Sequence, residues 1–235
     1  KSMYDLTYNG SSASGLGIRV RQRPHIPAPE RRTSRIQVPG KDGDYIIDED
    51  AWEDIEIEVD MGFFAAPAEW AAKWRAVRPW LKGTGTLQLS DDAGYQYRVK
   101  RIVLDTAERD IKRIGRFTVL FACDPYQYLT AGASMADLPA EGKLQNPLSE
   151  TAHPIYKITG EGVCTLTVNG YELTANVGQN LIIDTERRLT YRVDGTLQNT
   201  AISGDYDKLQ LTAGENTISV TDGFALQVQP NWRCI

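Results

Sequence analysis

The sequence predicts a mainly β protein in two parts, an N-terminal β-rich domain with one α-helix and a C-terminal antiparallel β-sandwich. Three observations support this prediction. Apolar and polar residues alternate over residues 54–60, as in a half-buried strand. Residues 67–83 have the periodicity of a helix. Beyond residue 150, short strand-like runs follow one another without a helical pattern, which is typical of a sandwich.

The first 50 residues contain short extended segments separated by breaks. We expect strands at Met3–Tyr8 and Gly15–Val20, and another extended run at Arg35–Val38. Prolines at 24, 27 and 29 interrupt regular structure between them. The sequence Pro39-Gly40-Lys41-Asp42-Gly43 predicts a turn, because proline fixes φ and glycine accepts positive φ.

One helix is expected, with Pro67 in its first turn and Gly83 at its end. Its large residues recur every three or four positions and form one stripe. We interpret this stripe as core packing; a subunit interface is the alternative. The residues concerned are Trp70, Trp74, Val77, Trp80 and Leu81.

The rest of the first half predicts a hairpin of Thr86–Ser90 with Tyr95–Leu104, then a strand Arg116–Cys123 that Asp124-Pro125 stops. Residues 131–149 are rich in Ala, Gly and Pro and are interpreted as a linker. The expected domains are therefore 1–130 and 150–235. The second is expected to hold short strands at 154–158, 164–168, 171–173, 180–184, 190–193, 208–211, 217–220 and 225–228.

The composition and charge of the chain argue against several classes of function. The net charge is −5, and residues 131–235 carry all of the excess, with 7 basic and 12 acidic residues, which argues against a general nucleic-acid binder. No apolar run is long enough to span a membrane, and we expect neither membrane insertion nor a secretory signal. The cysteines, Cys123, Cys164 and Cys234, are odd in number and have no metal-site spacing.

No catalytic or cofactor site is expected. The two histidines, His25 and His153, are interpreted as surface residues outside any triad or zinc pair. An acidic stretch lacks the glycine of a calcium loop and is interpreted as a solvated loop. Its residues are Asp42, Asp44, Asp48, Glu49 and Asp50.

A series of short motifs resembles the distal tail protein (Dit) family of long-tailed, non-contractile bacteriophages. The resemblance covers nearly the whole chain, although Cys234 replaces an aromatic residue of the terminal motif. The motifs are Val38-Pro39-Gly40-Lys41-Asp42-Gly43, Trp80-Leu81, Asn146-Pro147, Pro154-Ile155, Ala213–Ile218 and Pro230–Ile235.

This resemblance implies a virion structural protein, made in the host cytoplasm, from a phage or prophage tail tip. It implies a hexameric ring of N-terminal domains, a galectin-like second domain, and a baseplate hub that joins the tail tube, tape measure and tail-associated proteins. Receptor-binding proteins are further expected partners, and DNA is expected only in transit. The alternative function is a monomeric carbohydrate-binding module, for which Tyr171, Tyr191, Tyr206 and Phe224 are the available aromatics.

The acidic face of residues 54–60 has two interpretations. Cross-strand pairing with basic residues such as Arg98 and Lys100 is one. The other is that this face borders the pore of a ring, where acids prevent passing DNA from binding. The residues are Asp54, Glu56, Glu58 and Asp60.

Overall fold

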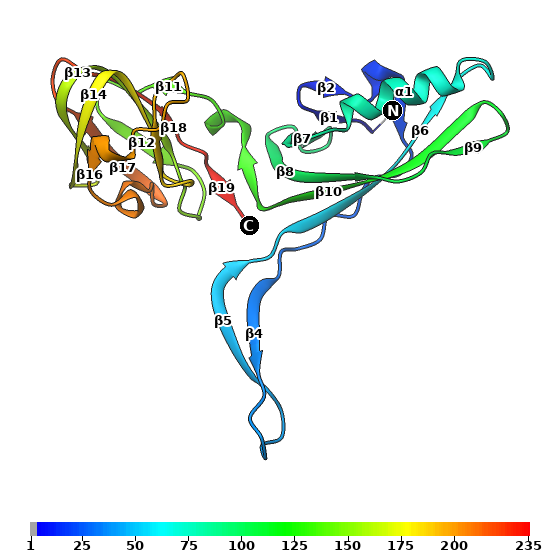
Figure 1. Ribbon diagram of the computed structural model, residues 1–235, viewed down its shortest axis with the longest axis horizontal. Coiled ribbons are helices and arrows are strands. Elements are labelled where there is room, and N and C mark those ends of the chain that lie inside the picture. Colours follow the sequence, from blue (N-terminus) through cyan, green and yellow to red (C-terminus); the bar gives the residue numbers. More distant parts are fainter. Residues whose placement is uncertain (1–3) are drawn as a thin grey trace. The chain divides into compact units, whose positions relative to one another are not determined.

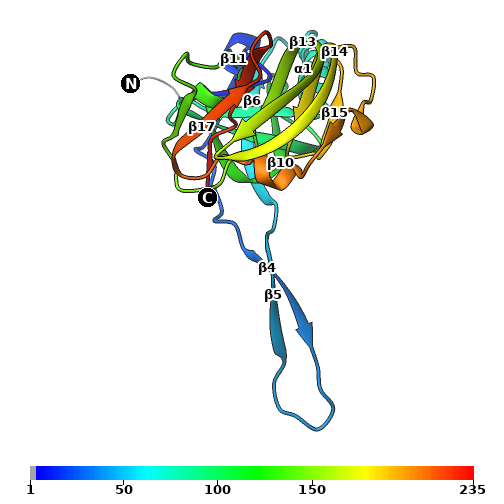
Figure 2. The ribbon, with the colours of Figure 1, turned by 90° about the vertical axis from the view of Figure 1, so that its left-hand side faces the viewer.

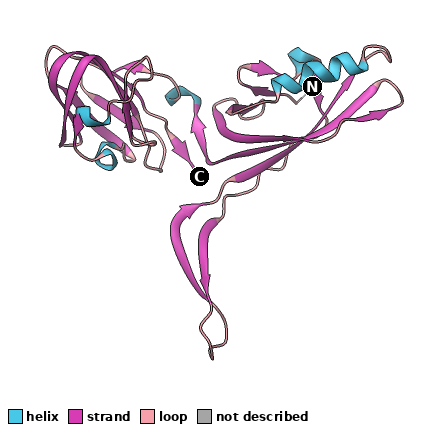
Figure 3. Ribbon diagram, in the orientation of Figure 1, coloured by secondary structure: helices cyan, strands magenta, loops and turns pink. Residues whose placement is uncertain are grey.

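The computed structural model describes residues 4–235, so Met3, the start of the first expected strand, lies outside the described residues. The fold is mainly β, with α1 (Trp70–Trp80) as the one α-helix of the described part (Figures 1 and 3). The chain divides into two compact units. They are Lys1–Gln127 together with Ile235, and Tyr128–Cys234.

The first unit is built on a curled antiparallel sheet with the strand order β2-β1-β7-β8-β10-β6-β3, and β9 also pairs with β10. The strands expected at Met3–Tyr8 and Gly15–Val20 are present as β1 and β3, both shorter than predicted. The strands are β1 (Leu6–Tyr8), β2 (Ser11–Ser12), β3 (Ile18–Val20), β6 (Ile55–Phe64), β7 (Gly85–Leu89), β8 (Tyr95–Leu104), β9 (Glu108–Asp110) and β10 (Ile114–Leu129). The short strand β19 (Arg233–Cys234) belongs to the second unit, as do the last two residues of β10.

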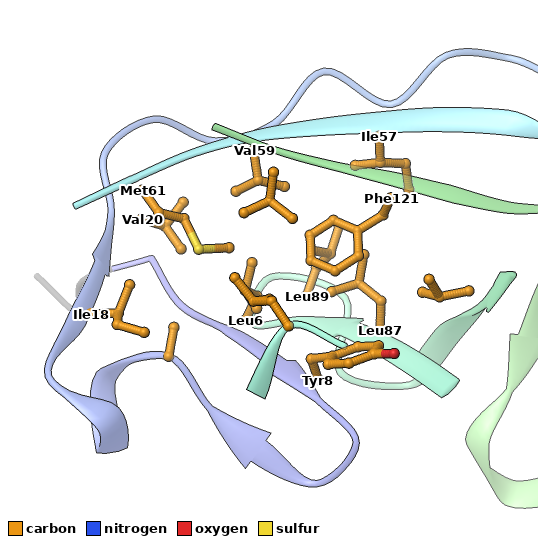
Figure 4. Close-up of a cluster of buried hydrophobic side chains, with 14 of the residues drawn as sticks. Leu6, Tyr8, Ile18, Val20, Ile57, Val59, Met61, Leu87, Leu89 and Phe121 are labelled. Atoms are coloured by element: carbon orange, nitrogen blue, oxygen red, sulfur yellow. The ribbon is translucent and has the colours of Figure 1, made fainter. Parts of the chain in front are cut away.

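The core of this unit lies inside the curl. Ile57, Val59 and Phe121 face Tyr8 and Leu87 of the opposite layer (Figure 4), and all five are fully buried. This is the period-2 alternation predicted for β6, whose odd-numbered residues point inward. Burial of apolar area on this scale is the main stabilising contribution to such a domain.

Helix α1 begins three residues after Pro67, which lies in the preceding turn, and its last turn contains Pro79. The backbone N–H of Leu81 donates to Val77 O at 3.4 Å, and the helix ends there. Val77 and Leu81 are buried, while the tryptophans of the stripe are half-buried against the core. The core interpretation of the stripe is therefore the one that the packing supports.

The largest difference from prediction in this unit is a hairpin of β4 (Arg31–Ile36) and β5 (Tyr45–Trp52), called the arm from here on. It forms a two-stranded sheet of its own (Figure 2). The expected acidic loop is wrong for Asp48, Glu49 and Asp50, which lie in β5. Strand β5 was missed because three apolar residues, Tyr45 to Ile47, are followed by three acidic ones, so its sequence has no apolar–polar alternation.

Strand β10 is also longer than predicted, since it continues through Asp124-Pro125 to Leu129. Its pairing with β6 ends at Cys123↔Ile55, two residues before the proline. A proline lacks an amide donor but keeps an extended φ, so a strand tolerates it where one neighbour ends.

The second unit contains an eight-stranded curled antiparallel sheet whose centre is the order β11-β18-β13-β14-β15. Residues 131–149 are not an unstructured linker, because β11 and β12 lie there and pair with β18 and β17. The strands are β11 (Ala136–Asp137), β12 (Lys143–Asn146), β13 (Ile155–Val168), β14 (Tyr171–Asp184), β15 (Leu189–Tyr191), β16 (Ile202–Ser203), β17 (Gly214–Val220) and β18 (Ala225–Gln229).

Two predicted pairs of short strands are in fact single long strands, β13 and β14, which pair over fourteen residues. Asn169-Gly170 turns between them as predicted, with both residues at positive φ. The strand expected at residues 208–211 is wrong, since η4 (Tyr206–Leu209) is a 3-10 turn that buries Leu209. Short 3-10 turns also occur at η1 (Ser14–Leu16), η2 (Thr130–Gly132) and η3 (Asn199–Ala201).

Candidate functional site

The outer face of the first sheet carries the predicted acidic row. Glu56 and Glu58 are exposed, and Asp60 is half-buried, while the intervening residues point into the core. Across the sheet, Glu56, Glu58 and Asp60 lie opposite Ala122, Leu120 and Thr118 of β10. Strand β8 therefore does not neighbour β6 directly, because β10 lies between them.

Basic residues of β8 nevertheless reach part of the acidic row. The Nζ of Lys100 lies 2.6 Å from Asp54 and 2.7 Å from Asp124. Burial lowers the pKa of Lys100, but these two carboxylates outweigh it and raise the pKa overall. Arg101, which the sequence analysis did not consider, approaches Glu56 at 3.7 Å.

Two carboxylates of the row, Glu58 and Asp60, have no ion-pair partner within residues 4–235. Asp60 accepts a hydrogen bond of 2.8 Å from Thr118 Oγ1. Glu56, Glu58 and Asp60 line one side of a shallow 430 Å³ concavity, and the proline-rich segment 22–27 lines the other. The row is thus partly neutralised at its Asp54 end and acidic towards Asp60.

The other end of β6 is basic. A 380 Å³ concavity, called the arginine basin below, lies on the same face and is lined from three strands. Its residues are Arg19 and Arg21 of the β3 segment, Gly62, Phe63 and Phe64 of β6, and Ile114 and Arg116 of β10. No sequence pattern reveals it, because Arg116 lies almost one hundred residues after Arg19 and Arg21 and none of the three belongs to a motif.

The arm carries the motif Val38-Pro39-Gly40-Lys41-Asp42-Gly43 at its tip, where the N–H of Lys41 donates to Val38 O at 3.1 Å. Gly40 and Gly43 have positive φ, so the predicted turn is confirmed. Near the base, Arg31 bridges Asp48 at 3.1 Å and Asp50 at 2.9 Å. The arm is therefore held by exposed ion pairs, which contribute little stability.

The tryptophans of the helix stripe pack against the core of their own unit, although the buried Nε1 of Trp70 has no hydrogen-bond partner among the described residues. Trp74 contacts Phe117 with ring centroids 5.1 Å apart and Phe63 at 6.5 Å. Trp80 Nε1 donates to Tyr8 O at 3.3 Å. These contacts place the stripe in the packing between helix and sheet.

Two other motifs have structural roles. The buried Asn216 accepts from Thr212 N at 2.9 Å and donates to Thr212 O at 2.8 Å, which closes the Ala213–Ile218 turn. It also accepts a hydrogen bond of 2.8 Å from Asn169, so this turn is fixed to the β13–β14 turn. In the terminal motif, Arg233 Nε donates to Thr151 O at 2.8 Å.

Neither histidine lies in a catalytic arrangement. His25 is exposed in the proline-rich segment, as expected. His153 is not a plain surface residue, since it is half-buried with Nε2 3.1 Å from the Arg233 guanidinium. Among residues 4–235, no three His, Cys, Asp or Glu side chains gather as a metal site would require. No helix of that part is long and apolar enough to cross a membrane.

The aromatics of the carbohydrate-binding alternative are largely used inside the second unit. Tyr171, Tyr206 and Phe224 pack against its core. The hydroxyl of Tyr171 accepts from Asp205 N, and that of Tyr206 contacts Thr190 Oγ1, both at 2.8 Å. These three rings therefore do not form an exposed platform for a sugar.

The fold of the complete chain is similar to that of the SPP1 Dit (gp 19.1) protein, whose crystal structure is described as a paradigm of the hub adsorption apparatus in phages that infect Gram-positive bacteria. The match covers 100% of both chains with a TM-score of 0.62 and 16% sequence identity. No protein-family model and no curated protein sequence matches the chain. At this identity the similarity establishes a shared fold, and function has to be argued from the surfaces described above.

Proposed function

We propose that this chain is a structural subunit of a bacteriophage or prophage tail tip, a distal tail hub protein. The observation that carries the proposal is the fold similarity to a phage hub protein over the full length of both chains. No catalytic step is part of this function. Its partners would be further copies of itself, the tail tube, tape measure and tail-associated proteins, and receptor-binding proteins.

The arm supports an assembling subunit. A two-stranded hairpin is at best marginally stable in water, yet this one exposes Ile36, Tyr45, Ile46 and Ile47. Tyr45 is 52% and Ile46 is 67% exposed. Exposed apolar residues concentrated on one segment mark a contact surface, so we infer that assembly buries the arm. A homo-hexameric ring of N-terminal domains (residues 1–130) is the assembly we propose, with the galectin-like domain (150–235) outside it.

In this ring the acidic row would border the central pore. Glu58 has no ion-pair partner among the described residues, so its negative charge is available to the lumen. Acidic walls do not attract phosphate, which would let DNA pass without binding. The row is expected to act as a lining and not as a binding site.

Mass measurement by light scattering across a concentration series, with negative-stain imaging, tests the ring. Six-fold rings with a central hole would support the proposal. A monomer at every concentration, even with tail-tube and tail-associated proteins added, would contradict it.

The pore is tested separately with Glu56→Lys/Glu58→Lys. In a ring that still assembles, genome ejection should slow, because lysines in the lumen attract phosphate. Unchanged ejection would show that the row lies elsewhere. Glu141→Lys/Glu172→Lys, at two exposed positions of the second unit, is the control with the same charge change.

A further inference from the structure

The arm tip has polar groups that its own chain does not use. Within residues 4–235, the carboxylates of Asp42 and Asp44 have no ion-pair or hydrogen-bond partner. They differ in this from Asp48 and Asp50 nearer the base, which pair with Arg31. The tip therefore has two unpaired acids beside the exposed apolar residues Val38, Ile46 and Ile47. Its basic residue, Lys41, is engaged within the arm, since its Nζ lies 3.3 Å from the centroid of the Tyr45 ring.

The arginine basin has the complementary free groups. In the described part of the chain, the guanidinium groups of Arg19 and Arg21 have no ion-pair partner within 4 Å. Arg116 is fixed at one side by Asp110 at 2.9 Å. Asp60, Asp105 and Glu108 lie on the neighbouring surface that Arg21 and Arg116 also line, but none of them lines the basin itself.

The basin also has an apolar floor that is built for close contact. A methyl group on Gly62 would lie 3.0 Å from the backbone oxygen of Gly115, which is closer than ordinary contact, so the two strands approach each other tightly at this position. Arg21 Cδ would lie 3.6 Å from the same methyl, an ordinary contact distance, so the arginine packs beside this glycine. Phe64, 67% exposed, and Ile114 supply apolar surface beside the arginines. An apolar concavity edged by arginines suits a segment that has an apolar side chain next to a carboxylate.

We propose that the arginine basin of one copy receives the arm tip of a neighbouring copy, with Asp42 and Asp44 paired to Arg19 and Arg21 and with Ile46 against Phe64 and Ile114. This inference rests on the proposed function and names the contact that joins the subunits. The contact is heterologous, because each copy supplies one arm and one basin, and such contacts generate closed rings. Strand β3, which borders the basin, is the edge of its sheet, where a further chain can approach.

Two charge-reversed variants test the contact, Arg19→Glu/Arg21→Glu and Asp42→Lys/Asp44→Lys. All four side chains are exposed, so both variants are expected to fold, with circular dichroism as the check. Each variant alone would place like charges together and is expected to remain a monomer by light scattering. An equimolar mixture makes every arm–basin contact favourable again, so it should recover the mass of the wild type.

The control is Arg187→Glu/Lys208→Glu, two exposed residues of the second unit with the same charge change, which should assemble like the wild type. If both variants alone assemble like the wild type, or if their mixture recovers no mass, the inference is overturned and the proposed function stands. A wild-type chain that never assembles would instead remove the proposed function. In that case the inference holds only if the equimolar mixture gains mass while neither variant gains mass alone, and it is overturned if the mixture gains none.

Discussion

Two hairpins of this chain have opposite relations to its core. In the β13–β14 hairpin, alternate residues are buried along both strands, and the pair lies at the centre of an eight-stranded sheet. In the arm, every residue from Arg31 to Asp50 that belongs to a strand is exposed, although β5 has a larger share of apolar residues than β13 or β14. The same secondary structure is therefore stabilised by the chain's own interior in one case and lacks such support in the other.

Apolar content alone therefore does not decide where a strand of this chain is buried. The β13–β14 side chains find a facing layer within the chain, whereas the arm's two-stranded sheet has none. Since an unsupported hairpin is marginal in water, the arm's apolar residues are best explained by contacts with another molecule.

The largest expected effect is on the core hairpin. Leu166→Ala in β13 should lower the free energy of unfolding by about 3–4 kcal/mol, because Leu166 is fully buried and its truncation leaves a cavity. Ile46→Ala in the arm should change it by less than about 0.5 kcal/mol. Urea denaturation of the isolated chain measures both. Equal losses would mean that the arm packs within its own chain.

The next effect concerns the turns. Asn216→Ala should cost about 2–3 kcal/mol, since it removes the hydrogen bonds that the fully buried Asn216 amide makes with the Thr212 backbone and with Asn169. Asn176→Ala, at an exposed position of β14, is the matched control and should cost less than about 0.5 kcal/mol. Similar unfolding midpoints for the two variants would show that the hydrogen bonds of Asn216 do not stabilise the fold.

The helix stripe provides a third test. Trp74→Ala should cost about 2–3 kcal/mol, less than for a fully buried tryptophan, because Trp74 is half-buried against Phe63 and Phe117. Urea denaturation of the isolated chain measures this loss. A loss below about 1 kcal/mol accompanied by failed assembly would instead place Trp74 at a subunit interface.

Glycines in the two turns give a smaller contrast. Gly170→Ala should cost about 1 kcal/mol from backbone strain alone, as Gly170 has a φ of 84° and no atom nearby that a methyl would meet. Gly43 has a similar φ of 78°. Because the arm can open locally without unfolding the core, Gly43→Ala should change the stability to global unfolding less than Gly170→Ala does. Thermal unfolding compares them, and equal shifts would show that the arm unfolds together with the core.

The smallest effect is the pH response. Burial raises the pKa of the Cys123 thiol to about 12, with Asp124 adding to the effect. A thiol whose pKa is raised on folding gives stability that is present below pH about 9 and is lost as the pH rises towards 12. Cys123→Ala should therefore reduce the alkaline fall in melting temperature between pH 9 and 11. An unchanged slope would assign that fall to other groups.

In the arm the corresponding group is Asp48, whose pKa is lowered by a hydrogen bond from Asp50 N and by Arg31. Because this pKa is lowered on folding, its contribution is present above pH about 4 and is lost as the pH falls. The core and the arm should thus respond to opposite ends of the pH scale. Hydrogen exchange of the arm amides at pH 3 and pH 6 measures the second response.

Local sequence signals predicted several elements correctly. Strand β6, helix α1, the β7–β8 hairpin and the Asn169-Gly170 turn each have an alternation, a periodicity or a turn pair that is complete within a few residues. The extended run expected at Arg35–Val38 covers only the last two residues of β4, and the β11 and β12 strands were hidden by an Ala, Gly and Pro-rich composition. Pro125 was expected to end its strand, but β10 continues through it to Leu129.

The sequence by itself determined the mainly β class, the single helix, the alternation of β6 and the presence of an acidic row, because backbone preference and side-chain periodicity act over short distances. The tertiary structure alone decided which residues share a surface. It brought Arg19, Gly62 and Arg116 into one basin and left the arm without a facing layer. Pairing of strands distant in sequence creates such surfaces, and no local pattern encodes their register.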